Sequence, residues 1–411
     1  MRLHLAILLA SLAALAACSE RDMPSSVGTA SAAASCRPIE TRPPNAPEQR
    51  PAFPGQTRVC GVRSHVAFDV VVLTDRLDTP WSVEPLPGGD LLVSEKPGRL
   101  RIVSAKGEIG PPISGVPKVD DRVQGGLLDV ALSPQFESDH TIFFSFSEPR
   151  EGGNGTSVAR AVLSADRRSL SDVRVIFRVT PTYPGVGHYG SRLAFGSDGM
   201  LYVTTGERSD TRMRKYAQDL GSTLGKTVRI APDGSAPKDN PFVGRKGARP
   251  EVWSYGHRNI QASAFDPQGK FWIVEHGTQG GDELNLIQKG KNYGWPLQAY
   301  GEEYSGTPIE SAATAREGME QPVYYWDPVI APSGAQFYTG EAFPAWRGSL
   351  FVGALKEQRL VRLAIEGDRV VGEEHLLTDR HQRIRDVRQG PDGLLYIATG
   401  GGQIWKLVPR H

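Results

Sequence analysis

The chain repeats a short pattern in which a polar turn leads into an apolar strand. Each copy has a turn rich in Pro, Asp and Gly beside apolar runs, which is typical of β-strands bounded by turns. The clearest copy runs from Leu193 to Val203, where Gly196-Ser197-Asp198-Gly199 separates two apolar segments. The strands that follow the turns in the other copies are expected to begin at these residues: Leu91, Thr141, Lys270, Ser349 and Leu394.

Six such copies predict an all-β chain folded as a six-bladed β-propeller, in which an N-terminal strand at 66–73 completes the last blade. A bare four-stranded blade needs about 40–45 residues, and the copies are spaced more widely than this. We therefore expect long loops on one face, mostly within 205–260 and 275–345, where they converge on a ligand near the axis. A large β-sandwich is the alternative, but its strands would not repeat a turn-and-hairpin unit so often.

Composition and charge agree with a folded β-protein and make some partners unfavourable. The chain has 46 Gly and 31 Pro, and hydrophobic residues make up 39% of it, enough for a sizeable core. Its 47 Lys and Arg balance 46 Asp and Glu, without a block of one sign. We expect no nucleic-acid partner, because such proteins usually carry a basic stripe.

The first 17 residues predict a signal peptide. Their apolar run lacks acidic residues and is shorter than the roughly 20 residues of a spanning helix. It ends in Leu15-Ala16-Ala17-Cys18, which resembles the bacterial lipobox, whose cysteine becomes the lipid-bearing N-terminus; an ordinary A-x-A cleavage site is the alternative. Because Ser19 rather than Asp follows Cys18, we expect a periplasm-facing lipoprotein anchored in the outer membrane, or else a periplasmic protein.

The segment 18–60 is polar and proline-rich, so it predicts a semi-extended tether ahead of a propeller domain over 61–411. Cys36 and Cys60 are the remaining cysteines. An even pair in an exported protein favours one disulfide, and two unpaired buried thiols are the alternative.

Five polar stretches stand out from the strand pattern: Val123–Asp129, Gly187–Leu193, Tyr255–Asn259, Glu275–Pro296 and Gln382–Val387. In this order, on a propeller pattern, they resemble the glucose and sorbosone dehydrogenase family, in particular its aldose sugar dehydrogenases. The resemblance covers roughly Thr79 to Val408. It implies a dehydrogenase that uses pyrroloquinoline quinone (PQQ) and Ca²⁺ to oxidise aldose sugars at C1.

His188 is the candidate general base. A neutral imidazole suits proton removal from a sugar hydroxyl, and the matching family histidine has this role. Glu207 matches a carboxylate that orients the histidine and fixes its tautomer. A lone histidine that satisfies a loop backbone is the alternative. The chain has Gly187 where the glucose dehydrogenases have an aspartate, so glucose-like substrate contacts are not expected there.

The resemblance implies a cofactor-binding set. Arg383 and Arg385 lie two apart, so on a strand they share one face and would hold the PQQ carboxylates; pairing with Asp379 and Asp386 is the alternative. Lys356 joins them in this role. The same resemblance assigns Gln124 to the cofactor and the Arg258-Asn259 pair to its quinone edge. There Arg258 would stabilise developing negative charge, unless the pair simply knits a loop.

The stretch from 275 to 295 offers oxygen ligands, which suit Ca²⁺ better than zinc. By resemblance, the carbonyls of Gly277 and Thr278 hold a catalytic calcium, while Glu283 and the Tyr293 carbonyl hold a structural one. A glycine-rich turn with solvated acids is the alternative. Aromatic residues in the same region form either a sugar-stacking rim or packing between blades: Trp295, Tyr300, Tyr304, Tyr324, Tyr325 and Trp326.

These observations predict that His188 removes the anomeric proton while hydride passes from C1 to PQQ, after which an unidentified external acceptor takes the electrons. A nicotinamide cofactor is not expected, because the chain has no G-x-G-x-x-G unit between a strand and a helix. A calcium-dependent propeller lactonase or esterase and a non-catalytic sugar-binding propeller are the alternatives. Both a monomer and a homodimer are compatible with the sequence.

Overall fold

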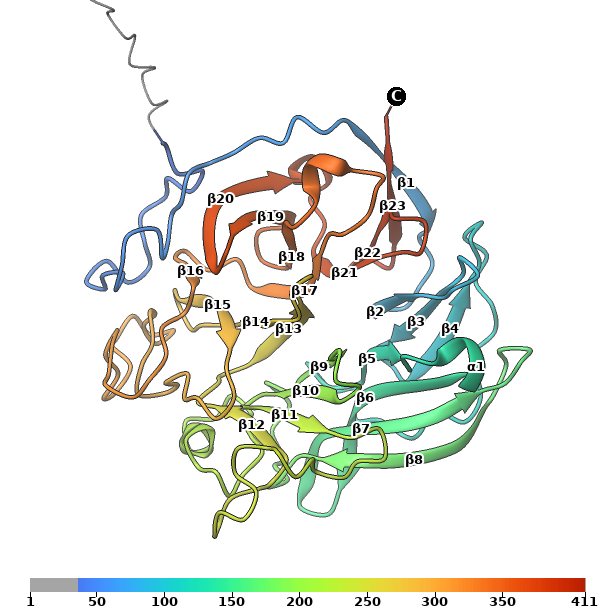
Figure 1. Cartoon of the computed structure of the whole chain (residues 1–411), viewed down its shortest axis with the longest axis horizontal. Helices are drawn as coiled ribbons and strands as arrows, with labels where there is room; N and C mark the ends of the chain where they lie inside the picture. The colour runs from blue at the N-terminus through green and yellow to red at the C-terminus, as the bar shows by residue number, and fades with distance from the viewer. Residues whose placement is uncertain (1–35, 411) are drawn as a thin grey trace, which may run out of the picture. The chain divides into compact units, whose positions relative to one another are not determined.

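The computed structural model describes residues 36–410, and its core is six antiparallel sheets around a common centre (Figure 1). The first three sheets in chain order are β2(Pro80–Pro85)-β3(Leu91–Glu95)-β4(Arg99–Val103), β5(Leu127–Leu132)-β6(Thr141–Arg150)-β7(Gly153–Leu163)-β8(Leu170–Arg178) and β9(Gly190–Phe195)-β10(Leu201–Thr205)-β11(Lys226–Ile230)-β12(Val252–Tyr255). The next two are β13(Ile260–Phe265)-β14(Phe271–Glu275)-β15(Asp282–Ile287)-β16(Tyr324–Trp326) and β17(Pro332–Phe337)-β18(Leu350–Ala354)-β19(Arg359–Glu366)-β20(Arg369–Leu376). The last is β21(Ile384–Gln389)-β22(Leu395–Thr399)-β23(Ile404–Pro409)-β1(Phe68–Thr74).

The sheets close into a ring through their first strands. β2 contacts β5, β5 contacts β9, and the series continues through β13 and β17 to β21, which contacts β2. The N-terminal strand β1 pairs with β23, so the two ends of the domain complete one blade. The predicted six-bladed propeller and its closure are confirmed. Within residues 36–410, four short helical turns lie outside the sheets: α1(Phe136–Asp139), η1(Arg214–Ala217), η2(Pro344–Trp346) and η3(Thr378–Arg380).

The repeated sequence unit is the hairpin between the first and second strands of a blade. In the clearest copy, Gly196 donates to the carbonyl of Met200 at 3.0 Å, and Gly199 takes a φ of 72°. That left-handed conformation favours glycine at the turn. The second strands β3, β10, β14, β18 and β22 are buried along their whole length, which explains why they read as continuous apolar runs. The longest connections fall at 104–126, 206–225, 231–251 and 288–323. The last three lie within the expected ranges, whereas 104–126, between β4 and β5, lies outside them.

Residues 37–60, which we expected to belong to a semi-extended tether, lie against the propeller, and we call them the strap. The backbone N–H of Asn45 donates to the Asp327 carboxylate at 2.6 Å. Gln56 is fully buried, and its carbonyl accepts a hydrogen bond of 2.8 Å from the N–H of Tyr325. The strap has no core of its own, but distant loops supply partners for its polar groups. Composition alone could not show those partners.

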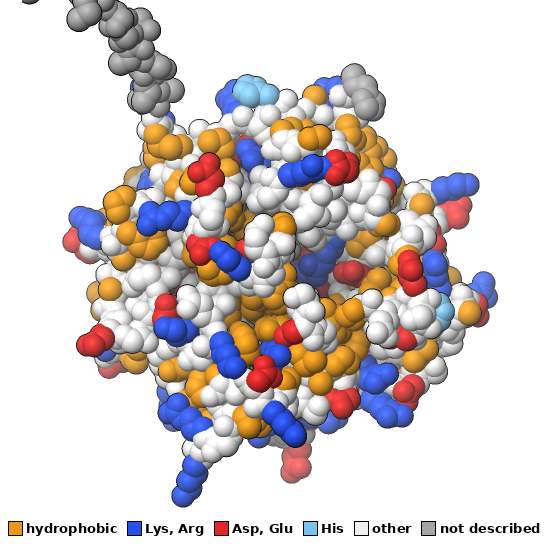
Figure 2. All heavy atoms as spheres, in the orientation of Figure 1, with side chains coloured by type: hydrophobic (Ala, Val, Ile, Leu, Met, Phe, Trp, Pro, Cys, Tyr) orange, Lys and Arg blue, Asp and Glu red, His pale blue; other side chains and the backbone are white. Residues whose placement is uncertain are grey.

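Both cysteines of the described part of the chain, Cys36 and Cys60, are disulfide-bonded, in agreement with the prediction. The predicted signal peptide and the lipid-bearing Cys18 lie outside the described residues. Within 36–410, no helix has the length and hydropathy needed to cross a bilayer. On the face shown in Figure 2, basic and acidic side chains are interspersed over the ring.

Candidate active site

A cavity of about 360 Å³ opens where the first strands of the blades begin. In an antiparallel hairpin, the start of the first strand and the end of the second lie at the same edge. The ring therefore gathers these segments from all six blades at one mouth. The lining follows this rule: Thr79, Pro80, Trp81, Lys96, Val123, Gln124, Leu128, Tyr189, Gly190, Asn259, Gln261, His276, Ala331, Leu355, Arg383, Arg385 and Gly400.

The predicted base His188 lies beside this lining, immediately before β9, and is buried. Its backbone N–H donates to Oε1 of Gln124 at 2.8 Å, and its ring Nδ1 lies 3.1 Å from Oε1 of Glu207. Within the described chain, ring Nε2 has no hydrogen-bond partner, so its lone pair is free to accept a proton. The backbone of His188 has a φ of 48°, an uncommon value for a residue other than glycine. The structure thus brings Gln124, His188 and Glu207 together.

Electrostatics keep this histidine neutral and its partner ionised. Burial lowers the pKa of His188, and the positive charge of Arg258 acts in the same direction, against the opposing effect of Glu207. Burial alone would raise the pKa of Glu207, but His188, Arg258 and the N–H of Ser209 outweigh it and leave the pKa lowered. A neutral ring that donates its Nδ1–H to a carboxylate presents Nε2 as a base.

Gly190, two residues after His188, allows the chain to turn at this point. Gly190 has a φ of 64°, and a Cβ at this position would lie 2.6 Å from the Cα of Thr205. Its N–H donates to Oδ1 of Asn259 at 3.1 Å, and Asn259 pairs with Gly206 in an isolated bridge. The close approach therefore joins two of the predicted stretches, Gly187–Leu193 and Tyr255–Asn259, with the segment that carries Glu207 around His188. The predicted Asn259 also lines the cavity.

Arg383 and Arg385 both line the cavity, and neither forms an ion pair with any residue in 36–410. The alternative pairing is excluded, because Asp379 lies beside Arg380 and Asp386 lies 2.8 Å from Arg192. Burial lowers the pKa of Arg385 to about 9, and the charges of Arg192 and Arg383 add to the effect.

Two guanidinium groups without acidic partners in one cavity form a site for an anion. Their spacing does not arise from a regular strand. Arg383 precedes β21, and Arg385 occupies a bulge where the β21–β22 register shifts. Lys356, which we also assigned to the cofactor, is exposed and does not line this cavity, although its neighbour Leu355 does. Lys356 stays a sequence prediction.

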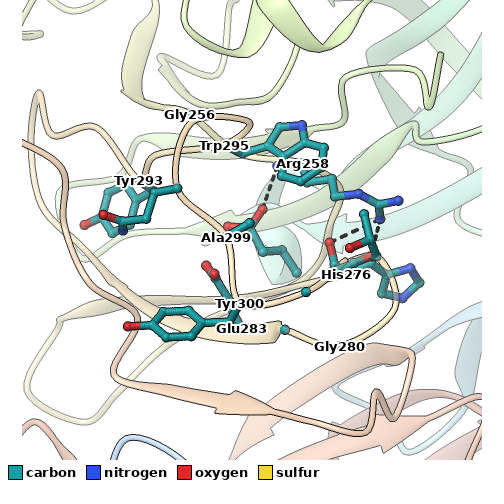
Figure 3. Close-up of a pocket in the computed structure, with 15 residues that line it drawn as sticks. Gly256, Arg258, His276, Gly280, Glu283, Tyr293, Trp295, Ala299 and Tyr300 are labelled. Atoms are coloured by element: carbon teal, nitrogen blue, oxygen red, sulfur yellow. Dashed lines mark hydrogen bonds between the residues drawn. The ribbon is translucent and has the colours of Figure 1, made fainter. Parts of the chain in front are cut away.

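A second, much smaller cavity of about 20 Å³ adjoins the first and contains all four predicted metal-binding residues: Gly277, Thr278, Glu283 and Tyr293. The two calcium sites expected from these residues stay a sequence prediction. Figure 3 shows Arg258 beside Trp295, with Glu283 beside Tyr300. His276 lines both cavities and so lies at their boundary.

The small cavity has the donor set of a hard cation. Glu283 is paired across the strands with Glu275, and burial together with the charge of Glu275 raises its pKa well above the ordinary value. The hydroxyl of Thr278 is buried and lacks a hydrogen-bond partner within the described chain. Two carboxylates, carbonyls and a free hydroxyl fit Ca²⁺.

Arg258 borders the small cavity and lies close to the candidate base and its partner Glu207. It is buried, and its guanidinium lies 5.2 Å from the ring centre of Trp295 and donates to the carbonyl of Gly277. Its backbone N–H donates to Glu275 at 2.7 Å, and its own carbonyl accepts the N–H of Glu207 at 2.9 Å. A positive charge is thus held between the candidate base and the candidate cation site.

Sequence reasoning missed several lining residues. Trp81 and Gln261 lie on first strands, where an apolar or mixed pattern looks like ordinary propeller core. His276 was given no role from the sequence; its Nε2 contacts the Pro332 carbonyl at 2.6 Å, and burial lowers its pKa to about 3. In the aromatic group, packing is the main role, because only Tyr304 is exposed, at 70%.

The fold and site define a propeller enzyme whose axial cavity is lined by two arginines, and comparison with known proteins identifies the family. Residues 77–406 match the Glucose / Sorbosone dehydrogenase family, and the chain belongs to this family of oxidoreductases. It is 44% identical over 349 residues to Aldose sugar dehydrogenase YliI of Escherichia coli, a match that covers 84% of this chain and 93% of that protein.

Solved structures agree. A crystal structure of glucose dehydrogenase is 48% identical with a TM-score of 0.80, covering 84% of this chain and 99% of that chain. The PQQ-bound form of aldose sugar dehydrogenase from Streptomyces coelicolor is 32% identical with a TM-score of 0.69, again covering 84% and 99%.

Proposed function

We propose that this protein oxidises aldose sugars at C1 to lactones, using PQQ and Ca²⁺, and passes the electrons to an external acceptor. The observation that carries the proposal is the pair Arg383 and Arg385, which face one cavity without acidic partners. In the same wall, Gln124 holds the backbone of the candidate base His188. The names of the relatives support this activity, since one is an aldose sugar dehydrogenase and another binds PQQ.

The cavity fits the cofactor in charge and size. PQQ is a planar tricarboxylate, and the two arginines supply the bidentate donors that carboxylates prefer. A volume of about 360 Å³ is in the range of small-molecule sites. Trp81 and Tyr189 add aromatic surface to the lining. The adjoining oxygen-rich cavity, bordered by Glu283, would hold Ca²⁺ close to the same mouth.

Bound PQQ supplies a quinone that accepts a hydride, and Ca²⁺ supplies a Lewis acid. In this scheme Nε2 of His188 takes the proton from the C1 hydroxyl as the C1 hydride leaves. The sugar thereby loses one proton and one hydride and becomes the lactone. Glu207 holds Nδ1 and stabilises the imidazolium that forms. The guanidinium of Arg258 offers positive charge beside the site where negative charge develops.

The test is reconstitution. The purified protein is incubated with PQQ and Ca²⁺, given a panel of aldoses, and assayed by bleaching of a redox dye together with detection of the lactone. We expect bleaching that needs PQQ and is lost in His188→Ala but not in His140→Ala, a change at an exposed histidine outside the cavity. Absence of bleaching with every aldose, combined with lactone hydrolysis, would indicate the calcium-dependent hydrolase instead.

A further inference from the structure

Arg192 lies directly behind the wall of the large cavity without lining it. It is on β9, one of the six strands that form the inside of the ring, and only 1% of its surface is exposed. A fully buried arginine needs partners for its charge and its five N–H donors. Its partners are what connect it to the candidate site.

On the cavity side, Arg192 contacts three residues of the lining. Its Nε donates to the carbonyl of Gln261 at 2.7 Å, and its Nη2 donates to the carbonyl of Arg385 at 3.1 Å. Its guanidinium lies 4.2 Å from the ring centre of Trp81. These three residues come from β13, β21 and β2, so one side chain joins the inner strands of three other blades.

On the opposite side, two acids fix Arg192. Nη1 lies 3.1 Å from Asp129 and 2.8 Å from Asp386, and both carboxylates are fully buried. Each acid is itself held by the backbone. Asp129 accepts the N–H of Leu193 at 2.8 Å, and Asp386 accepts the N–H of Val83 at 3.0 Å. The charge of Arg192 is thus neutralised within the ring, whereas Arg385 keeps its charge free for a ligand.

We propose that Arg192 is a positioning residue for the cofactor: it fixes the backbone of Arg385, the backbone of Gln261 and the ring of Trp81 before PQQ binds. The proposal rests on the proposed function, because it concerns binding of the same anion. A planar guanidinium donates in several fixed directions, so it can contact the Gln261 carbonyl, the Arg385 carbonyl and the Trp81 ring at once, and a lysine cannot. Walls held in place in the free protein lower the ordering cost of binding.

The test uses Arg192→Lys, which keeps the charge and loses the fork. Binding of PQQ to the cofactor-free protein in the presence of Ca²⁺ is measured by quenching of tryptophan fluorescence, so no turnover is needed. We expect Kd for PQQ to rise about 10- to 100-fold, the usual loss when a residue that orients a ligand-binding group is changed.

The matched control is Arg362→Lys. Arg362 is equally enclosed on β19, where it lies 2.6 Å from Glu374 and 3.0 Å from the hydroxyl of Ser349, away from the cavity lining. It should lower Tm without changing Kd for PQQ. If Arg192→Lys lowers Tm as the control does but binds PQQ like the wild type, Arg192 is only structural and the proposal is wrong.

A second variant tests the same role if Arg192→Lys does not fold. Arg192→Met combined with Asp386→Asn removes one positive and one negative charge together, so no buried charge is left uncompensated. Its Kd should also rise at least about tenfold, and an unchanged Kd would overturn the proposal. Wild-type protein is titrated in parallel, and absence of PQQ binding there would refute the proposed function rather than the role of Arg192.

Discussion

Replacing Arg385 with methionine should raise the free energy of unfolding of the cofactor-free protein and lower its affinity for PQQ. Arg385 is partly buried, has no ion pair within 36–410, and lies close to the charges of Arg192 and Arg383. Its charge therefore costs folding free energy until an anion arrives. Replacing buried charge by an apolar side chain of similar volume stabilises proteins by about 1–4 kcal/mol in favourable cases. We expect a gain near the lower end of that range, seen as a higher Tm without PQQ.

The expected loss of PQQ affinity follows from the hydrogen bonds that the Arg385 guanidinium would donate to a PQQ carboxylate. A hydrogen bond to a charged group contributes about 1.5–3 kcal/mol, which corresponds to a rise in Kd of about 10- to 150-fold. The assays are calorimetric unfolding of the cofactor-free protein and a fluorescence titration with PQQ. The pKa of Arg385, at about 9, lies below that of the unfolded chain, so its charge opposes folding below pH 9 and the penalty fades above it. The stability difference between the variant and the wild type should shrink accordingly as pH rises through 9.

Arg388→Met is the matched control on the same strand. Arg388 lies 3.1 Å from Asp129 and 3.5 Å from Glu84, so its removal takes one cation from this cluster and leaves Arg192 as the arginine beside the buried Asp129. We expect this variant to lose about 3–5 kcal/mol of stability. If Arg385→Met also destabilised the empty protein and left Kd unchanged, Arg385 would be a structural arginine and the reasoning would fail.

Three further predictions concern other parts of the site. His188→Ala should lower kcat/KM at least about 100-fold with PQQ affinity retained. Because burial holds the pKa of His188 below its ordinary 6.5, wild-type kcat/KM should stay level as pH falls to 6.5. A fall in kcat/KM that begins above pH 6.5 would contradict the assignment. Calcium should raise Tm more at pH 8 than at pH 5, because the raised pKa of Glu283 makes its ionisation destabilise the metal-free fold at higher pH. Glu283→Gln should abolish this difference. If Ca²⁺ raised Tm in the variant as it does in the wild type, with the same pH dependence, the site would be refuted. Gln56→Ala should cost about 1–3 kcal/mol, because it strips a hydrogen bond from the buried hydroxyl of Tyr300, and an unchanged Tm would mean that the strap contributes little.

Local patterns in the sequence predicted the blades, because each hairpin depends on neighbours in the chain. The Gly196–Gly199 turn fixes a hairpin by itself, and the short motif around His188 was enough to select it as the candidate base. The contacts of Arg192 with Gln261 and Arg385 join residues far apart in the chain, and only ring closure brings them together. No local pattern carries that information.

The strap and the small cavity also depend on contacts that the local sequence does not show. Proline-rich composition predicted a tether over 18–60, and the burial of Gln56 depends on loops more than 240 residues away, such as the one that carries Tyr300. The family resemblance assigned Gly277 and Glu283 to different ions, and that assignment stays a prediction. Their common cavity appears only when β14 and β15 are paired.

We propose that segments from all six blades form one quinone site at the mouth of the ring. A crystal structure of the protein with PQQ and Ca²⁺ would test this directly. We expect PQQ carboxylates on Arg383 and Arg385, with the quinone end toward His188 and Arg258. A quinone bound outside this cavity, or one whose carboxylates contact neither arginine, would contradict it.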